Sequence, residues 1–351
     1  MRNFWSVLTL TITCALLSIN IWAKDNAVIL LYHHVSNSTP KVTSVSPDTF
    51  REHMQYLADN HKVLPLEQVI EALQNKQLLP DKTVVITFDD GFDNIYDNAH
   101  PILKDFGFPY TVFVNPPLIG SASYQLDWQQ VKLMATEKVS FANHGKRHNH
   151  LLRRRPDESK KNWLIRTMQD IQDAEELLEQ NIGYSLKYFA YPFGEFDKKL
   201  KIQLETQGYI GFAQHSGAIA SFSDFTALPR FPAAGIYSNL NTLKVKLNSL
   251  AMPVTDINPD DPKVNPPIQN NKFSFNVQTE DFTTQQINCF QNGKLLNNSI
   301  IENTISVTIE PIIQPGRHRV NCTAPSISDK GRYYWLSQPF FMPTPEGIWL
   351  D

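Results

Sequence analysis

An apolar strand that ends in two adjacent carboxylates limits the folds open to this chain of 351 residues. Residues 84–91 have the sequence Val-Val-Ile-Thr-Phe-Asp-Asp-Gly, and the β-branched and aromatic run predicts a buried strand. Buried strands do not tolerate paired carboxylates unless a metal ion or hydrogen-bond donors compensate the charge. Because parallel α/β sheets carry their chemistry where strands end, Asp89 and Asp90 belong either to an active site or to a solvated turn.

Two further predicted strands also end in titratable residues. The strand at residues 27–35 carries His33 and His34, and the strand at 139–142 is followed by His144 and His148. Strand and helix patterns alternate about once every 30 to 40 residues, which is typical of βα units around a parallel sheet. Predicted helices lie at 48–60, 66–74, 95–106, 153–180, 198–207 and 240–250, and further strands at 110–114, 188–194 and 210–213.

Composition divides the chain into four segments. Residues 1–23, with Arg2 before an apolar run, predict a cleaved secretory signal, and an uncleaved N-terminal anchor is the alternative. We therefore expect an exported protein, periplasmic or secreted, without a stable membrane span after cleavage. Residues 24–251 form the α/β domain, 252–268 a proline-rich linker and 269–351 a β-rich domain. The formal charge of −3 does not indicate a protein that binds nucleic acid.

The last segment has the pattern of a small β-sandwich. Short strands recur between hairpin signals such as Asn292-Gly293, and its two cysteines lie on separate predicted strands. We expect Cys289 and Cys322 to form one disulfide across facing strands, with Cα atoms roughly 4.4–6.8 Å apart. The aromatic residues at 333–335 are either a glycan platform or sandwich core.

One carboxylate with two imidazoles is an established open site for a divalent metal ion. Asp90, His144 and His148 provide that set, and the four-residue spacing of the histidines allows one helical turn to aim both at one point. Each histidine alone is more often a satisfied polar residue than a metal ligand. The prediction of a metal site is stronger because these residues lie at the ends of predicted strands.

Taken in order, these residues resemble the polysaccharide deacetylases, the NodB-homology domain of carbohydrate esterase family 4, over about residues 27–250. Residues 87–91, Thr-Phe-Asp-Asp-Gly, match the first motif of that family. Residues 144–148 resemble its second motif with Gly145 in place of serine or threonine, and 191–194 resemble its third, preceded by Ala190 where many members have arginine. The early Tyr32-His33-His34 is similar to the poly-N-acetylglucosamine deacetylase branch.

The resemblance implies a distorted (β/α) barrel of about seven strands and a metal-dependent hydrolase that removes N-acetyl groups from an N-acetylated polysaccharide or oligosaccharide. Asp90, His144 and His148 are then the ligands of a divalent metal ion, Zn²⁺ in our expectation. Asp89 is the general base that accepts a proton from the attacking water.

The same resemblance assigns three further residues. The backbone N–H of Phe193 donates to the developing oxyanion, and His33 is the general acid that protonates the leaving amine. His34 is its nearest competitor, with His150 and His215 more distant. Arg230 orients Asp89 in place of the arginine missing at position 190.

Two alternative functions stay open at this point. The same water and base would serve an O-acetyl esterase, so the sequence does not separate amide from ester hydrolysis. A non-catalytic carbohydrate-binding protein is the other alternative, and the departures at Gly145 and Ala190 favour it.

Overall fold

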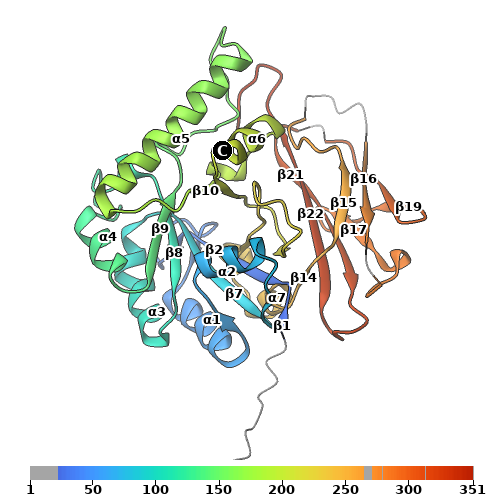
Figure 1. The fold of residues 1–351 in the computed structure, drawn as a ribbon, viewed down its shortest axis with the longest axis horizontal. Coiled ribbons are helices and arrows are strands. Elements are labelled where there is room, and N and C mark those ends of the chain that lie inside the picture. The colour runs from blue at the N-terminus through green and yellow to red at the C-terminus, as the bar shows by residue number, and fades with distance from the viewer. Residues whose placement is uncertain (1–22, 265–270, 279, 313, 351) are drawn as a thin grey trace, which may run out of the picture.

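The computed structural model describes residues 23–264, 271–278, 280–312 and 314–350, and it consists of an α/β part and an all-β part (Figure 1). The predicted signal segment, apart from Ala23, lies outside the described residues. Within the described ranges, no helix combines the length and the apolar character that crossing a bilayer requires.

A nine-stranded sheet forms the centre of the α/β part. Its strands follow the order β11, β10, β9, β8, β7, β2 and β12, with β13 beside β2 and β5 beside β7. All pairings are parallel except that of β12 with β2. The strands are β2 (Ala27–Tyr32), β5 (Lys62–Val63), β7 (Thr83–Asp90), β8 (Tyr110–Val114), β9 (Val139–Asn143), β10 (Tyr188–Ala190), β11 (Ile210–Phe212), β12 (Ala218–Ile219) and β13 (Phe231–Pro232). This curled, mainly parallel sheet confirms the predicted barrel-like α/β fold.

Helices connect the strands, and α1, α3, α4 and α5 lie along the outer side of the sheet in Figure 1. The helices are α1 (Pro47–Asn60), α2 (Leu66–Gln74), α3 (His100–Phe106), α4 (Trp128–Ala135), α5 (Lys160–Ile182), α6 (Lys198–Thr206) and α7 (Leu240–Leu247). Helix α1 shows why such segments are helical. Ser46 caps its first turn by accepting a hydrogen bond from the N–H of Thr49, and Phe50, Met54 and Leu57 bury one face completely.

The predicted start of the long helix α5 is wrong by seven residues. The helix begins at Lys160 instead of Arg153, with Ser159 as its cap. Pro156 lies in the intervening loop and Asp157 has a φ of 57°, so the backbone of residues 153–159 does not continue the helix. This loop borders the candidate site.

Two sheets form the all-β part and share one apolar core, and their strands are antiparallel except for the parallel pairing of β14 with β22. The first contains β14 (Leu250–Ala251), β22 (Tyr333–Met342), β21 (Gly316–Pro325), β17 (Asn288–Gln291) and β18 (Lys294–Leu295). The second contains β15 (Val254–Asn258), β16 (Lys272–Val277), β20 (Thr304–Thr308) and β19 (Asn297–Ile301). Phe273, Phe275 and Val307 from the second sheet pack with Val320 and Phe340 from the first, as expected for a sandwich.

Residues 265–268 of the predicted linker lie outside the described residues, and residues 252–264 are not a free connection. Residues 254–258 form β15, which pairs with β16, because their backbone groups complete the edge of the second sheet. Leu250 and Ala251 pair with β22, so the chain is already part of the sandwich before the predicted boundary. Trp335 packs edge-on against Phe231 of the α/β part at 5.2 Å, and it therefore joins the two parts instead of forming a glycan platform.

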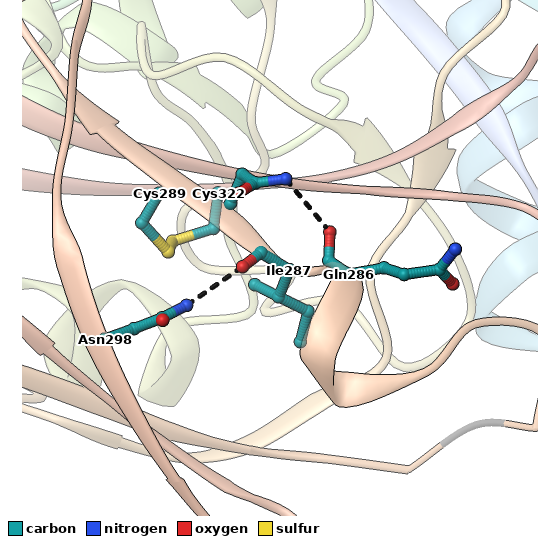
Figure 2. Close-up of a disulfide and its surroundings, with 6 residues drawn as sticks. Gln286, Ile287, Cys289, Asn298 and Cys322 are labelled. Carbon is teal, nitrogen blue, oxygen red and sulfur yellow. Dashed lines mark hydrogen bonds between the residues drawn. A yellow bond between two sulfur atoms is a disulfide. The ribbon is translucent and has the colours of Figure 1, made fainter.

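Cys289 and Cys322 form a disulfide, as predicted (Figure 2). They occupy opposite positions of the neighbouring strands β17 and β21, so the bond joins two strands of one sheet. Their Cα atoms lie 4.0 Å apart, which is below the predicted range of roughly 4.4–6.8 Å. In Figure 2 the amide of Asn298 donates to the carbonyl of Ile287 beside this bond.

Candidate metal and catalytic site

The candidate site lies where parallel strands β7, β8 and β9 end. Asp90 is paired in register with Val114 of β8, and Val114 is paired with Asn143 of β9. His144 follows β9 directly, and its backbone N–H donates to the carbonyl of Val114 at 2.8 Å. The sheet register therefore brings the carboxylates of β7 and the first histidine to the same edge.

Asp90, His144 and His148 converge as the sequence predicted, with their potential ligand atoms all within 4.8 Å of one another. Oδ1 of Asp90 lies 3.4 Å from Nε2 of His144 and 3.5 Å from Nε2 of His148. One ion can contact all three side chains only if their tips lie within about 6 Å of one another, and they do.

His144 has the surroundings of a metal ligand. It is fully buried, and its Nδ1 donates to the carbonyl of Ala190 at 2.8 Å, which leaves Nε2 as the unprotonated nitrogen. That Nε2 has no hydrogen-bond partner among the described residues. A buried acceptor that faces a carboxylate and lacks a donor fits a cation between them, so the residues present fit a divalent metal ion.

The charges of the site favour a cation as well. Burial lowers the pKa of His144, but the negative charges of Asp89 and Asp90 outweigh burial and raise it overall. Burial raises the pKa of Asp90, yet its interaction with the imidazole of His144 holds it well below its usual range. Burial, followed by the charge of His144, lowers the pKa of His148 to about 4, so this imidazole is neutral near pH 7. An ionised Asp90 and a neutral His148 are the states that metal ligands need, and the negative charge that raises the pKa of His144 is what a cation would compensate.

The two histidines converge through a loop, not through the predicted helical turn. Gly145 has a φ of 78° and His148 a φ of 49°, and neither value belongs to a right-handed helix. Asn143 accepts a hydrogen bond from the N–H of Gly145 at 2.7 Å. Asn115 holds the loop from the other side by donating to the carbonyls of His144 and Gly145 at 2.6 and 3.0 Å. Sequence reasoning did not single out either asparagine.

Arg230 holds Asp89 as the sequence analysis expected, with closer contact than that analysis implied. Both side chains are fully buried, and Nη1 and Nη2 of Arg230 each donate to one oxygen of Asp89 at 2.7 Å. The guanidinium also donates to the carbonyl of Ala213 and lies over the ring of Phe113, so its orientation is fixed. Burial raises the pKa of Asp89, but the charges of Arg230 and His144 and the hydrogen bonds from Arg230 lower it overall.

His33 and His34 have different surroundings, as expected for neighbouring residues of an extended chain. The positive charge of His33 contributes to lowering the pKa of Asp89 and of Asp90, after the larger effects of burial and other partners. His34 stacks on Phe92 with ring centroids 3.8 Å apart, and its Nδ1 lies 2.9 Å from the amide nitrogen of Asn94. His34 is thus engaged in the loop beside the site.

The more distant histidine His215 has other neighbours. It is partly exposed, and burial lowers its pKa to about 4, with Asp224 acting in the opposite direction. Lys201 and Arg319 are the further charges that act on it, whereas the carboxylates that end β7 are not among them. Its position does not favour a role as proton donor at those carboxylates.

Phe193 lies in a strained turn that three side chains clamp. The residue has φ 57° and ψ 2° within the 3₁₀ segment Pro192–Gly194. Its ring stacks on the ring of His150 with centroids 4.0 Å apart. The guanidinium of Arg317, a residue of β21, lies 5.3 Å from the centroid of the Phe193 ring. Glu195, with 1% exposure, lies 2.9 Å from Nδ1 of His150 and accepts from Nη1 of Arg317 at 3.4 Å. Glu195 and Arg317 are 122 residues apart, and no local sequence signal predicts their contact.

Comparison with known proteins finds one matching family model, polysaccharide deacetylase, over residues 76–211. The poly-β-1,6-N-acetyl-D-glucosamine N-deacetylase of Staphylococcus epidermidis is 28% identical over 234 residues, which cover 60% of this chain and 79% of that protein. The deacetylase PplD of Streptococcus pyogenes, solved in complex with acetate, superposes with a TM-score of 0.56 and 25% identity over 63% of this chain and 98% of that one. IcaB from Ammonifex degensii has the same fold, with a TM-score of 0.56 and 22% identity over 64% of this chain and 97% of that one.

Proposed function

We propose that the protein hydrolyses N-acetyl groups of an N-acetylhexosamine polysaccharide or oligosaccharide, in keeping with the match of residues 76–211 to the polysaccharide deacetylase family. The observation that carries the proposal is the convergence of Asp90, His144 and His148 beside a carboxylate, Asp89, that Arg230 holds. The Staphylococcus epidermidis relative is named as an N-deacetylase, which supports N-deacetylation. The apolar segment within residues 1–23 supports export, to the periplasm or the medium.

Asp90, His144 and His148 would hold the metal ion, and we propose Zn²⁺ because the set contains two imidazoles and one carboxylate. When bound, such an ion supplies a Lewis acid that lowers the pKa of water and polarises a carbonyl group. His144 is oriented for this role by the carbonyl of Ala190, which accepts from its Nδ1.

Asp89 acts as general base and takes one proton from the attacking water. Its Oδ2 lies 3.9 Å from Nε2 of His144, so the base stands next to the ligand set. The bidentate contact with Arg230 occupies one lone pair of each carboxylate oxygen, and another lone pair of each remains to accept a proton. The low pKa of Asp89 keeps it ionised near pH 7, as a base requires.

Two groups complete the reaction in this proposal. The backbone N–H of Phe193, aimed by the strained turn, donates to the oxygen that becomes negative as the carbonyl is attacked. His33 then gives a proton to the amide nitrogen, the C–N bond breaks, and acetate and the free amine leave. The electrostatic effect of His33 on both carboxylates supports this assignment.

Acetate release from N-acetylglucosamine oligomers by the purified protein tests the proposal. A chelator should abolish release and added Zn²⁺ should restore it. Asp89→Asn should retain the metal content of the wild type, because Asp90 and both histidines remain, and should lose about 10²–10⁴-fold in kcat. Full activity after chelation, or wild-type turnover by Asp89→Asn, would contradict the mechanism. Release from acetyl esters alone would indicate an O-acetyl esterase.

A further inference from the structure

A cleft of about 1450 Å³ begins at His148 and Phe193, and positively charged side chains line one part of it. The loop between β9 and α5 supplies Arg153, Arg154 and Arg155 in succession. Other lining residues are Arg166, Lys263, and residues 343–349 of the all-β part, among which Glu346 is the acidic side chain. The cleft therefore joins the candidate catalytic site to a basic wall.

Neighbouring acids do not neutralise most of this wall. Arg166 is the exception, because Glu158 accepts two hydrogen bonds from it, at 2.7 and 2.8 Å. Arg154 donates to the backbone carbonyl of Glu158, which leaves its charge uncompensated by that contact. Arg153 and Arg155 are exposed, and neither side chain forms an ion pair with any residue that the structure describes, although the charge of Arg155 acts on the nearby carboxylate of Glu158. Three arginine charges thus face the cleft.

The pKa of Lys263 is affected by the same positive charges. Burial lowers its pKa, the carboxylates of Asp197 and Asp261 oppose this effect, and the charges of Arg154 and Lys160 lower it further. The whole chain has a formal charge of −3, so the basic wall is a local feature and not a consequence of general basicity.

A neutral acetylated glycan has no anionic group that the positive charges of this wall would bind. Deacetylation turns acetamido groups into amines, and the wall repels the cationic product of a neutral polymer. Guanidinium groups instead match carboxylate and phosphate oxygens in geometry and charge. We infer that the cleft binds an acidic group, carboxylate or phosphate, on the glycan whose acetamido group is hydrolysed, so that the preferred substrate is an anionic N-acetylated glycan.

This inference rests on the proposed function, and it adds the charge of the substrate to that function. His148 and Phe193 belong both to the candidate catalytic site and to the cleft, so one glycan chain can occupy both. The acidic group then lies on the part of the chain that extends from the reacting sugar towards residues 153–155.

The test compares three N-acetylated oligosaccharides of equal length: a neutral one, one with uronate carboxylates and one with phosphodiester groups. For the full mature protein supplied with Zn²⁺, kcat/KM on an acidic glycan should exceed that on the neutral glycan by at least about tenfold at low salt. The preference should shrink as ionic strength rises, because the arginines are exposed. The acidic glycan that is preferred identifies the acidic group.

The double variant Arg153→Ala/Arg155→Ala should reduce the preference for the acidic glycan about tenfold, mostly through KM. Lys132→Ala/Lys199→Ala is the matched control, because it removes two exposed positive charges outside the cleft and should leave the preference unchanged. Equal kcat/KM on neutral and acidic glycans, or an equal effect of the two double variants, would overturn the inference.

A binding titration with metal-free protein separates this inference from the proposed function. Tighter binding of an acidic than of the neutral glycan, lost in Arg153→Ala/Arg155→Ala, supports the basic cleft even if no glycan is deacetylated. Deacetylation of the neutral glycan, together with equal binding of all three glycans, refutes the cleft and leaves the proposed function standing.

Discussion

Replacing Arg230 with alanine tests the assignment of Asp89 most directly, because the two side chains form a fully buried bidentate ion pair. Both N–O distances are 2.7 Å, and neither side chain has exposed surface. Removing one partner of such a pair leaves the other charge buried without compensation, at a cost of about 3–5 kcal/mol in the free energy of unfolding. We expect a loss in this range for Arg230→Ala at pH 7.

The pH dependence of this loss follows from the pKa of Asp89. In the wild type that pKa is lowered on folding, so the ion pair contributes stability above the unfolded pKa, and this contribution is lost as pH falls through the folded pKa. Without Arg230, burial raises the pKa of Asp89 instead, and the penalty disappears once the carboxyl is protonated. The stability difference between wild type and Arg230→Ala should therefore be largest near pH 7 and shrink towards pH 4.

Urea unfolding of the metal-free proteins at both pH values measures the effect. Arg230→Ala/Asp89→Asn should recover part of the loss, because asparagine has no charge to compensate. Arg51→Ala is the control: Arg51 and Asp105 have 51% and 60% exposed side chains, and breaking this surface pair should cost no more than about 1 kcal/mol. The reasoning fails if Arg230→Ala costs no more than Arg51→Ala, or if its cost grows towards pH 4.

Three further predictions concern the acid, the clamped turn and the disulfide. His33→Ala should lose about 10²–10⁴-fold on amides but far less on an aryl acetate, whose leaving group needs no proton; loss on both substrates would contradict this role. Deleting an oxyanion donor costs about 10²–10³-fold in kcat, and Arg317→Ala should cost less, because it only loosens the turn that holds Phe193. Its metal content should be unchanged, and Arg317→Lys should restore part of the activity. An equal loss in Arg319→Ala, on the same strand, would contradict the role of Arg317. Replacing both Cys289 and Cys322 with alanine should destabilise the sandwich by about 3–4 kcal/mol, from the separation of 33 residues; titration of two free thiols in the oxidised wild type would contradict the bond.

The sequence predicted the elements of the barrel because each strand is a short apolar run and each helix an amphipathic one. Helix α1 and strand β7 have nearly the predicted bounds for that reason. The predicted boundaries of helices and strands are wrong where no apolar pattern marks them. Polar residues 153–159 are compatible with helix or loop, and the turn at Asp157 decided between them. Residues 254–258 include Asp256 and are flanked by Pro253 and Pro259, yet they pair with β16 because the sandwich edge is available.

The ligand set was predictable because its members follow strands that end at the same edge of one parallel sheet. The residues that orient the set were not, since they come from distant parts of the chain. Arg230 and Asp89 are 141 residues apart, and Arg230 was identified only through a resemblance. Asn115 donates to the carbonyl of His144 from the end of another strand, and an asparagine at a strand end has many ordinary explanations.

The departures that favoured a non-catalytic protein have physical explanations in the structure. At position 145 the backbone has a φ of 78°, a conformation that glycine adopts without strain, and the neighbouring Asn143 supplies a side-chain oxygen to its N–H. At position 190 the backbone carbonyl, not the side chain, contacts the site by accepting from His144. Arg230 provides a guanidinium for Asp89 from a later part of the chain, so an arginine at position 190 is not needed for that contact. Neither departure removes a group on which the proposed hydrolysis depends.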